Sequence, residues 1–365
     1  VWIPLTLLVA LLPSSGLRAQ FVELAPSGDN QRSTVIQGIG PVEVEVRYSS
    51  PNVHAPDGTD RRGKIWGERV PWGLANLNFG TCGEYCPWRG GANENTTVRL
   101  SHDVEVKGQK LAAGIYGLHF IPGKEEWVVI FSHDSTSWGS FSYNPKEDAL
   151  RVTVRPEASS YHEFPNYEFT DRSADRATLA LQWEDLQVPI PIAVPDVVEL
   201  YVTGLRHQLR SRPGFQWEGW NQAAGYLLDN KVHPDEALAW AQNAVALPGI
   251  GVENFQTLTT LARAQENAGA PAVKAEAAAT RDKALRHPTA TVFDLHQYGR
   301  QLLRAGDQAG AIEVFELNAT RFPDQWPVNV GLMRAYAAAG RNKEALKAAK
   351  AALTHLIVAK KSEPD

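Results

Sequence analysis

The segment of residues 78–96 holds the densest set of side chains in this sequence that could do chemistry. It contains Cys82 and Cys86, the two cysteines of the chain, together with Arg89, Asn93 and Glu94. Four glycines interrupt the segment, which is typical of a structured loop and not of a strand or a helix. It matches no known nucleophile, metal or phosphate motif, so we regard the loop as a candidate site without an assigned reaction.

Arg89, Asn93 and Glu94 form a polar trio with two interpretations. A planar guanidinium beside an amide and a carboxylate can hold a ligand carboxylate or sugar hydroxyls in a fixed orientation. The same side chains can instead bond to one another and to loop carbonyls, because a glycine-rich loop leaves many backbone groups in need of partners. An ion pair between Arg89 and Glu94 would leave neither side chain free for chemistry.

Cys82 and Cys86 are predicted to form a disulfide with each other, because an oxidising compartment pairs the two cysteines of an exported chain. The ring is small, and its expected role is to shape the loop around Trp88 and Arg89. A redox-active pair is the alternative, although the spacing is not Cys-x-x-Cys. Two thiolates leave a zinc site short of ligands, and no histidine follows Cys86 as haem attachment requires.

Tryptophans are abundant in the first half of the chain, at positions 66, 72, 88, 127, 138 and 183. Most are expected to pack in a core, because large aromatic side chains fill β-sandwich interiors. We expect one or two of them, Trp72 and Trp88 first, to be exposed near the loop, where aromatic side chains can stack on sugars or peptides.

Four histidines could join a carboxylate in a mixed nitrogen and oxygen metal site. They are His54, His102, His119 and His133, with Glu94 or Asp134 as the acid. No His-x-His or His-Glu-x-x-His spacing supports this hypothesis, so neither a metal nor another cofactor is expected.

The elements that must position these residues follow from the apolar pattern. Between residues 34 and 194 apolar and polar positions alternate, which predicts half-buried strands. The alternating apolar residues are Val42, Val44, Val46, Tyr48, Val98, Leu100, Val104, Val106, Ile115, Leu118, Phe120, Val128, Val129, Ile130, Phe131, Leu150, Val152, Val154, Leu179, Leu181, Val188, Ile190 and Ile192. Turn residues such as Lys107 and Gly108 separate them. Seven or more short strands predict an all-β antiparallel sandwich over residues 33–194.

The pattern changes after Pro195, where alanine becomes abundant and apolar residues recur at helical spacing. Leu302, Gly306, Ala311 and Phe315 have counterparts 34 positions later at Tyr336, Gly340, Ala345 and Ala349. This period is typical of tetratricopeptide helix-turn-helix repeats, which we predict over residues 219–358 after a connecting helix and hinge at 195–218. An irregular helical bundle rich in alanine is the alternative.

The first residues predict export. An apolar run at residues 2–13, followed by Ser14, Ser15 and Gly16 and by a small residue at Ala19, is typical of a signal peptide, here residues 1–19. We therefore expect a periplasmic or extracellular protein. The run is too short to cross a bilayer and no later stretch is apolar enough, so no membrane span is expected. The net charge of -5 argues against a nucleic-acid partner.

Several motifs resemble one known family. They include VPWG at residues 70–73, WRGGANENT at 88–96, AGIYGL at 113–118, WGSFSY at 138–143 and DALRV at 148–152. In this order they resemble the bacterial secreted domain-of-unknown-function family 2911 over residues 33–194. The resemblance implies the sandwich, export and a following helical region, but no activity. The family passes directly from the first motif to Trp-Arg, whereas an insertion here carries both cysteines.

These patterns lead to the hypothesis of an exported binding or scaffold protein. The repeats would bind a protein or peptide, and the sandwich loop would contact a small molecule or glycan. The expected contact residues are Trp72, Trp88, Arg89, Asn93, Glu94 and His119. The alternative is a hydrolase-like or metal-assisted enzyme with a pocket around Arg89, Glu94 and His119, joined by His102, in which Glu94 acts as general base or metal ligand. A third interpretation gives the loop a purely structural role.

Overall fold

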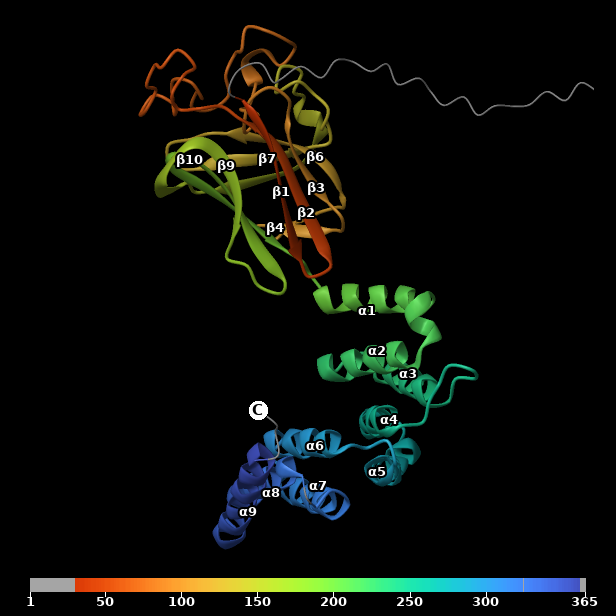
Figure 1. The fold of residues 1–365 in the computed structure, drawn as a ribbon. Coiled ribbons are helices and arrows are strands. Elements are labelled where there is room, and N and C mark those ends of the chain that lie inside the picture. The colour runs from red at the N-terminus through yellow and green to blue at the C-terminus, as the bar shows by residue number, and fades with distance from the viewer. Residues whose placement is uncertain (1–29, 324, 362–365) are drawn as a thin grey trace, which may run out of the picture. The chain divides into compact units, whose positions relative to one another are not determined.

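The computed structural model describes residues 30–323 and 325–361, with side chains as far as residue 354. The chain divides into two compact units, and the boundary falls between Val197 and Val198. The first unit is built of strands and the second of helices (Figure 1). The predicted signal peptide at residues 1–19 lies outside the described residues.

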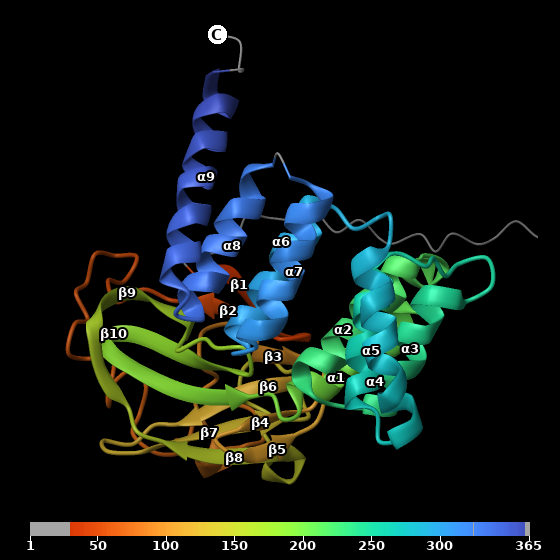
Figure 2. The ribbon, with the colours of Figure 1, turned by 90° about the horizontal axis from the view of Figure 1, so that it is seen from below.

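The described part of the first unit contains two antiparallel sheets, shown from a second direction in Figure 2. The larger sheet has the order β1 (Gln31–Ile39), β2 (Val42–Ser50), β3 (Thr96–Leu100), β6 (Gly114–Ile121), β7 (Trp127–Ser132) and β8 (Asp148–Val154). The smaller has the order β5 (Gln109–Leu111), β4 (Val104–Val106), β10 (Arg176–Ala193) and β9 (Glu157–Thr170). Lys107 and Gly108, both with positive φ, make the predicted turn between β4 and β5.

The core between the sheets explains the alternation in the sequence. Val42, Val44 and Val46 of β2 are all buried on one face. Tyr48 of β2 packs edge-on against Tyr167 of β9 with ring centroids 4.7 Å apart, so the two sheets face each other. Burial of this apolar surface is the main stabilising contribution to the fold. The predicted all-β antiparallel sandwich is confirmed.

Strand β9 was not expected from the sequence. The first half of β9 is largely exposed, including Tyr161 and Phe164, so this half lacks the apolar alternation that identifies a half-buried strand. It is held at the sheet edge by its ladder with β10. The segments around Leu179 and Val188, predicted as separate strands, belong to the one long strand β10, whose register shifts on either side of Glu184.

The second unit consists of helices that pack in consecutive pairs. After α1 (Val197–Gln208) come the pairs α2 (Trp217–Asn230) with α3 (Pro234–Ala246), α4 (Phe255–Asn267) with α5 (Pro271–Arg286), α6 (Val292–Arg304) with α7 (Gln308–Arg321), and α8 (Trp326–Ala338) with α9 (Asn342–Lys361). The first helices of neighbouring pairs also meet, α2 with α4 and α6 with α8. None of the described helices is long and apolar enough to cross a membrane.

The repeat predicted from the 34-residue offset has a clear physical basis. Gly306 and Gly340 have φ of 84° and 72° at equivalent turns, a backbone conformation that favours glycine. The Phe315 ring of α7 lies against glycines of α6 and α8, because a Cβ added to Gly299 or Gly331 would come within 2.7 or 2.3 Å of it. Small residues therefore let these helices approach closely, and the predicted helical repeats are confirmed.

Candidate functional site

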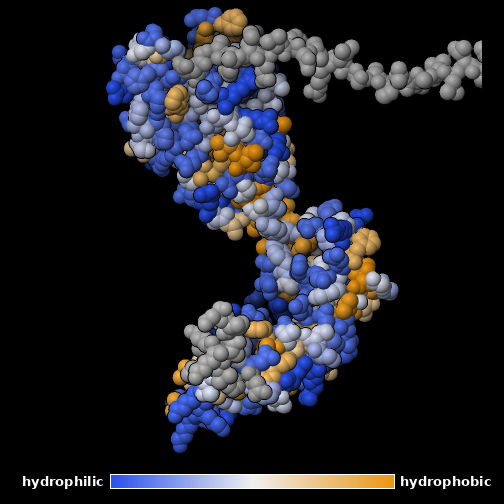
Figure 3. Space-filling model, in the orientation of Figure 1, coloured by the Kyte–Doolittle hydropathy of each residue, from blue (hydrophilic) through white to orange (hydrophobic). Residues whose placement is uncertain are grey.

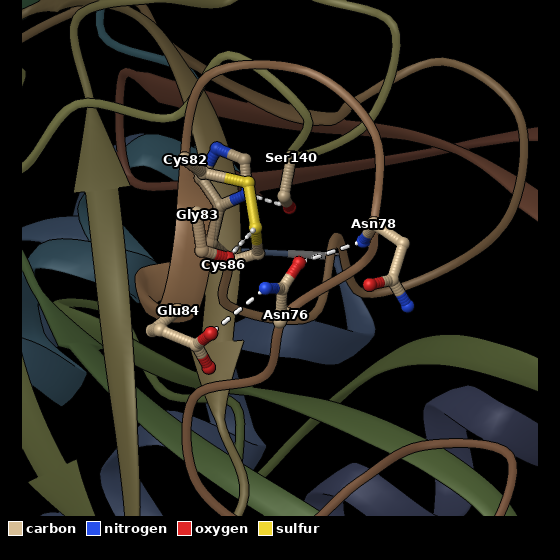
Figure 4. The surroundings of a disulfide bond; sticks show 8 residues. Asn76, Asn78, Cys82, Gly83, Glu84, Cys86 and Ser140 are labelled. Atoms are coloured by element: carbon tan, nitrogen blue, oxygen red, sulfur yellow. Dashed lines mark hydrogen bonds between the residues drawn. A yellow bond between two sulfur atoms is a disulfide. The ribbon is translucent and has the colours of Figure 1, made fainter.

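The loop that carries the cysteines is braced at several points. Cys82 and Cys86 form the predicted disulfide, with their Cα atoms 5.2 Å apart, and both are buried. Cys86 exchanges two backbone hydrogen bonds of 3.1 Å with Ala75. Figure 4 shows the disulfide beside Asn76, whose amide donates to Glu84 at 2.8 Å. The loop is therefore a fixed structure with little freedom to rearrange.

A cavity of about 300 Å³ lies between this loop and the residues that precede it. One wall comes from residues 69–77 and the other from residues 86–93. The lining side chains and backbone belong to Arg69, Pro71, Gly73, Ala75, Leu77, Cys86, Pro87, Trp88, Arg89, Gly91, Ala92 and Asn93. We call this cavity the loop pocket.

Arg89 is the half-buried cation of the loop pocket. Its Nη1 donates to the backbone carbonyl of Asn93 at 2.6 Å, and its Cζ lies 4.8 Å from the centre of the Phe141 ring. Its guanidinium also lies against Gly139, where a Cβ would be 2.1 Å from Cζ. Burial lowers the pKa of Arg89, because desolvation disfavours its charged form. Within the described part of the chain, no carboxylate lies at ion-pair distance from it.

The other two members of the polar trio point to different partners. Glu94 forms an ion pair with Arg32 of β1 and accepts a hydrogen bond from Ser49 Oγ at 3.4 Å. The side-chain oxygen of Asn93 accepts from Asn30 at 3.3 Å, while its backbone holds Arg89. The pairing of Arg89 with Glu94 considered from the sequence is therefore absent from the described residues, and Arg89 keeps its charge available.

The two tryptophans expected at the loop differ from each other. Trp72 is exposed at 36% and lies beside Gly67, but it does not line the loop pocket. Trp88 lines the pocket while the rest of its ring belongs to an aromatic cluster, where it stacks on Trp183 at 6.0 Å and meets Trp66 edge-on at 5.7 Å. Of the two candidates, Trp72 is therefore the exposed one, and Trp88 is partly buried by this cluster.

His119 of β6 is buried on the face of the larger sheet that points away from the smaller sheet, beside Ser140 and Tyr143. It is 2% exposed, and its Nδ1 is 2.9 Å from Oγ of the buried Ser140. Burial lowers the pKa of His119 to about 4; Arg89 contributes in the same direction and Asp134 opposes it. His119 is therefore neutral at physiological pH. It does not line the loop pocket, and the Ser140 hydroxyl and the Tyr143 ring cover it.

The enzyme hypothesis placed Arg89, Glu94 and His119 around a single pocket, and the loop pocket does not have this lining. Of the three, Arg89 alone lines the loop pocket. His102 is exposed and hydrogen-bonded to Ser101, so it does not join them either. The other histidines lie elsewhere: His54 contacts Glu163 and His133 lies against the Tyr116 ring. The described residues include no group of three or more histidine, cysteine or acidic side chains that could hold a metal.

Two features of the site were not found from the sequence. Arg69 lines the loop pocket opposite the Arg89 segment, although it lies in the stretch before the cysteine insertion. The second is a groove of about 240 Å³ across the first helices of three repeats, α2, α4 and α6. Its lining residues are Asn221, Phe255, Gln256, Thr259, Thr260, Arg263, Asp294, Gln297, Tyr298 and Gln301. We call it the repeat groove.

Together, these observations define a β-sandwich with a braced loop pocket, followed by tetratricopeptide-like helical repeats with a polar groove. Residues 30–192 match the model of the family described as protein of unknown function (DUF2911), in agreement with the resemblance of the motifs.

One solved structure, "Crystal structure of MamA", is 17% identical, covers 45% of this chain and 92% of its own, and has a TM-score of 0.29. A second, "Crystal structure of MamA protein", is 19% identical, covers 46% and 86%, and also has a TM-score of 0.29. No curated protein matches the sequence.

Proposed function

We propose that this protein is a binding scaffold whose helical unit holds an extended peptide segment of a protein partner in the repeat groove. The observation that carries the proposal is the Oδ1 atom of Asn221. This oxygen is buried in the groove wall and has no hydrogen-bond partner among the described residues. A buried acceptor left without a partner costs about 1–3 kcal/mol, and rotation of this amide toward a donor of a bound peptide would offset that cost.

The remaining lining of the repeat groove suits a peptide backbone. Asn221, Gln256, Gln297 and Gln301 come from three different helices. Each amide side chain can both donate and accept, as can the N–H and C=O groups of an extended peptide. The groove therefore offers paired donors and acceptors along its length, as recognition of a main chain requires.

Charge and apolar contacts in the groove complete this interpretation. Arg263 is already paired with Asp229 at 2.6 Å, and Asp294 caps the start of α6. Phe255 and Tyr298, whose rings meet edge-on at 6.3 Å, provide an apolar surface between the polar side chains. Neither sign of charge dominates the groove, so we expect recognition by backbone hydrogen bonds and apolar anchors, not by ionic attraction.

Selection of a displayed library of unstructured peptides against the full chain tests this proposal. Wild-type protein should enrich a peptide set. The double variant Gln256→Ala/Gln297→Ala and the single variant Asn221→Ala should bind those peptides roughly tenfold or more weakly. Gln308→Ala removes an exposed amide of α7 outside the groove and should bind as wild type does. Equal binding by all variants, or no enrichment, would refute the proposal.

We also propose that the protein is exported to an oxidising compartment. The apolar leader expected from the sequence and the Cys82 to Cys86 disulfide support this location. Mass spectrometry of the native protein should find a mature N-terminus after Ala19 and no free thiol. A native protein that retains residues 1–19 with two reduced cysteines would contradict export.

A further inference from the structure

We infer that the loop pocket of the β unit is a binding site for an organic carboxylate with an apolar body. This inference concerns a different unit from the repeat groove and does not depend on it. It rests on the charge, the burial and the shape of the pocket lining.

The charge in the loop pocket is of one sign. Arg69 and Arg89 both line it, and none of the described lining residues is acidic. Most arginines of the β unit have a carboxylate partner, which is the ordinary arrangement on a protein surface. The ion pairs join Arg32 to Glu94, Arg47 to Glu45, Arg62 to Asp60, Arg99 to Glu43, Arg151 to Asp148, Arg155 to Glu126 and Arg176 to Asp175. Within the part of the chain that is described, Arg69 and Arg89 have no such partner, and they share one cavity.

Arg89 is fixed in place without being neutralised. The Asn93 carbonyl, the Phe141 ring and the Gly139 backbone hold its guanidinium from three directions. These contacts orient the group but supply no negative charge, so its desolvation remains uncompensated by a counter-ion. A ligand carboxylate can accept two parallel hydrogen bonds from a guanidinium and would provide that charge. Arg69 is exposed and can approach the same anion from the opposite wall.

The rest of the lining is apolar. Pro71, Leu77, Pro87 and Trp88 contribute carbon surface, and Asn93 is the one uncharged lining residue with a polar side-chain amide. A sugar would bring many hydroxyls that this wall cannot satisfy, and unsatisfied polar groups weaken binding. The volume of about 300 Å³ lies at the lower end of small-molecule sites. The lining therefore favours a small carboxylate with an apolar body over a glycan.

Backbone hydrogen bonds and the disulfide connect the two walls of the loop pocket. Cys86 pairs with Ala75 across the pocket and with Cys82 in the disulfide. Trp88 exchanges two backbone hydrogen bonds, of 2.8 and 2.7 Å, with Phe120 of β6. Gly73 donates to the Pro122 carbonyl at 2.7 Å. Both walls are thus attached to the sandwich, which reduces the ordering cost of binding.

Titration of the full chain, monitored by NMR of the arginine Nε–Hε groups, tests this inference. The probes are 3-phenylpropanoate, its neutral amide 3-phenylpropanamide, and phenyl phosphate. We expect 3-phenylpropanoate to shift the Arg89 resonance saturably, with the amide binding roughly tenfold or more weakly because it lacks the charge. Arg89→Gln should weaken carboxylate binding by about tenfold or more and Arg69→Gln by a few-fold.

A charge-matched control separates the pocket from general electrostatics. Arg172→Gln removes an exposed arginine of the same unit that does not line the pocket, and it should bind 3-phenylpropanoate as wild type does. Three outcomes would overturn the inference: no saturable shift at millimolar probe, equal binding of acid and amide, or equal loss in the Arg172 and Arg89 variants. Tighter binding of phenyl phosphate would overturn the assignment to carboxylates. None of these outcomes affects the peptide selection at the repeat groove.

Discussion

The buried imidazole of His119 makes the stability of the β unit depend on pH in a way that can be calculated. The unfolded side chain binds a proton at a pKa of about 6.5, whereas burial lowers the pKa in the folded unit to about 4. Below pH 6.5 the unfolded state therefore binds more protons, and the folded unit loses stability as the pH falls toward 4. At about 1.4 kcal/mol per pH unit between the two pKa values, the full loss is about 3 kcal/mol.

The variant His119→Gln isolates this contribution. Glutamine has no proton to bind, so the variant should be less stable at neutral pH through imperfect packing but should lose about 2.5 kcal/mol less than wild type between pH 7.5 and 4.5. Hydrogen exchange of the β6 and β7 amides, measured across a urea series, gives the unfolding free energy of the β unit separately from that of the helices. His102→Gln, at an exposed histidine, is the matched control and should follow wild type. Parallel loss of stability in wild type and the His119 variant would refute the reasoning.

Three further predictions concern packing, the disulfide and the surface ion pair. Gly331→Ala should destabilise the helical unit by about 1–3 kcal/mol, because its Cβ would lie 2.3 Å from the Phe315 ring. Gly225→Ala in α2, where no atom lies within 4 Å of the added Cβ, should instead stabilise the helical unit by up to about 1 kcal/mol. Equal melting temperatures for the Gly331 and Gly225 variants would contradict the close contact between Gly331 and Phe315. The double change Cys82→Ser/Cys86→Ser should destabilise the β unit by about 2 kcal/mol and weaken 3-phenylpropanoate binding, so unchanged affinity would show that the disulfide does not shape the pocket. Glu94→Gln removes a partly exposed pair with Arg32 and should cost less than about 1 kcal/mol without changing the Arg89 titration. A large change in 3-phenylpropanoate affinity would instead place Glu94 in the binding site.

The sequence was informative wherever a local pattern determines the structure. The alternation of Val42, Val44 and Val46 identified β2, and Gly306 and Gly340 marked equivalent turns of successive repeats. The disulfide followed from having two nearby cysteines and no others. In each case the physical cause acts over a few residues or one repeat, so a single sequence contains it.

Features that depend on distant pairing could not be predicted in the same way. Glu94 pairs with Arg32, which lies 62 residues earlier, and that choice leaves Arg89 without a carboxylate. Arg69 lines the loop pocket because the backbone of Ala75 pairs with that of Cys86. No pattern in the sequence predicts this backbone pairing. Strand β9 was missed because its first half is largely exposed, although Pro165, Tyr167 and Phe169 of its second half are buried in alternation and were overlooked.

The measurement that tests the central claim most directly is the side-chain amide NMR spectrum of the full chain with a peptide from the display selection. The account predicts saturable shifts of the amide resonances of Asn221, Gln256, Gln297 and Gln301, the four amides that line the repeat groove. Gln308 on α7 should not move. Shifts confined to the second helices of the repeats, with the groove amides unchanged, would contradict the claim that this groove is the partner site.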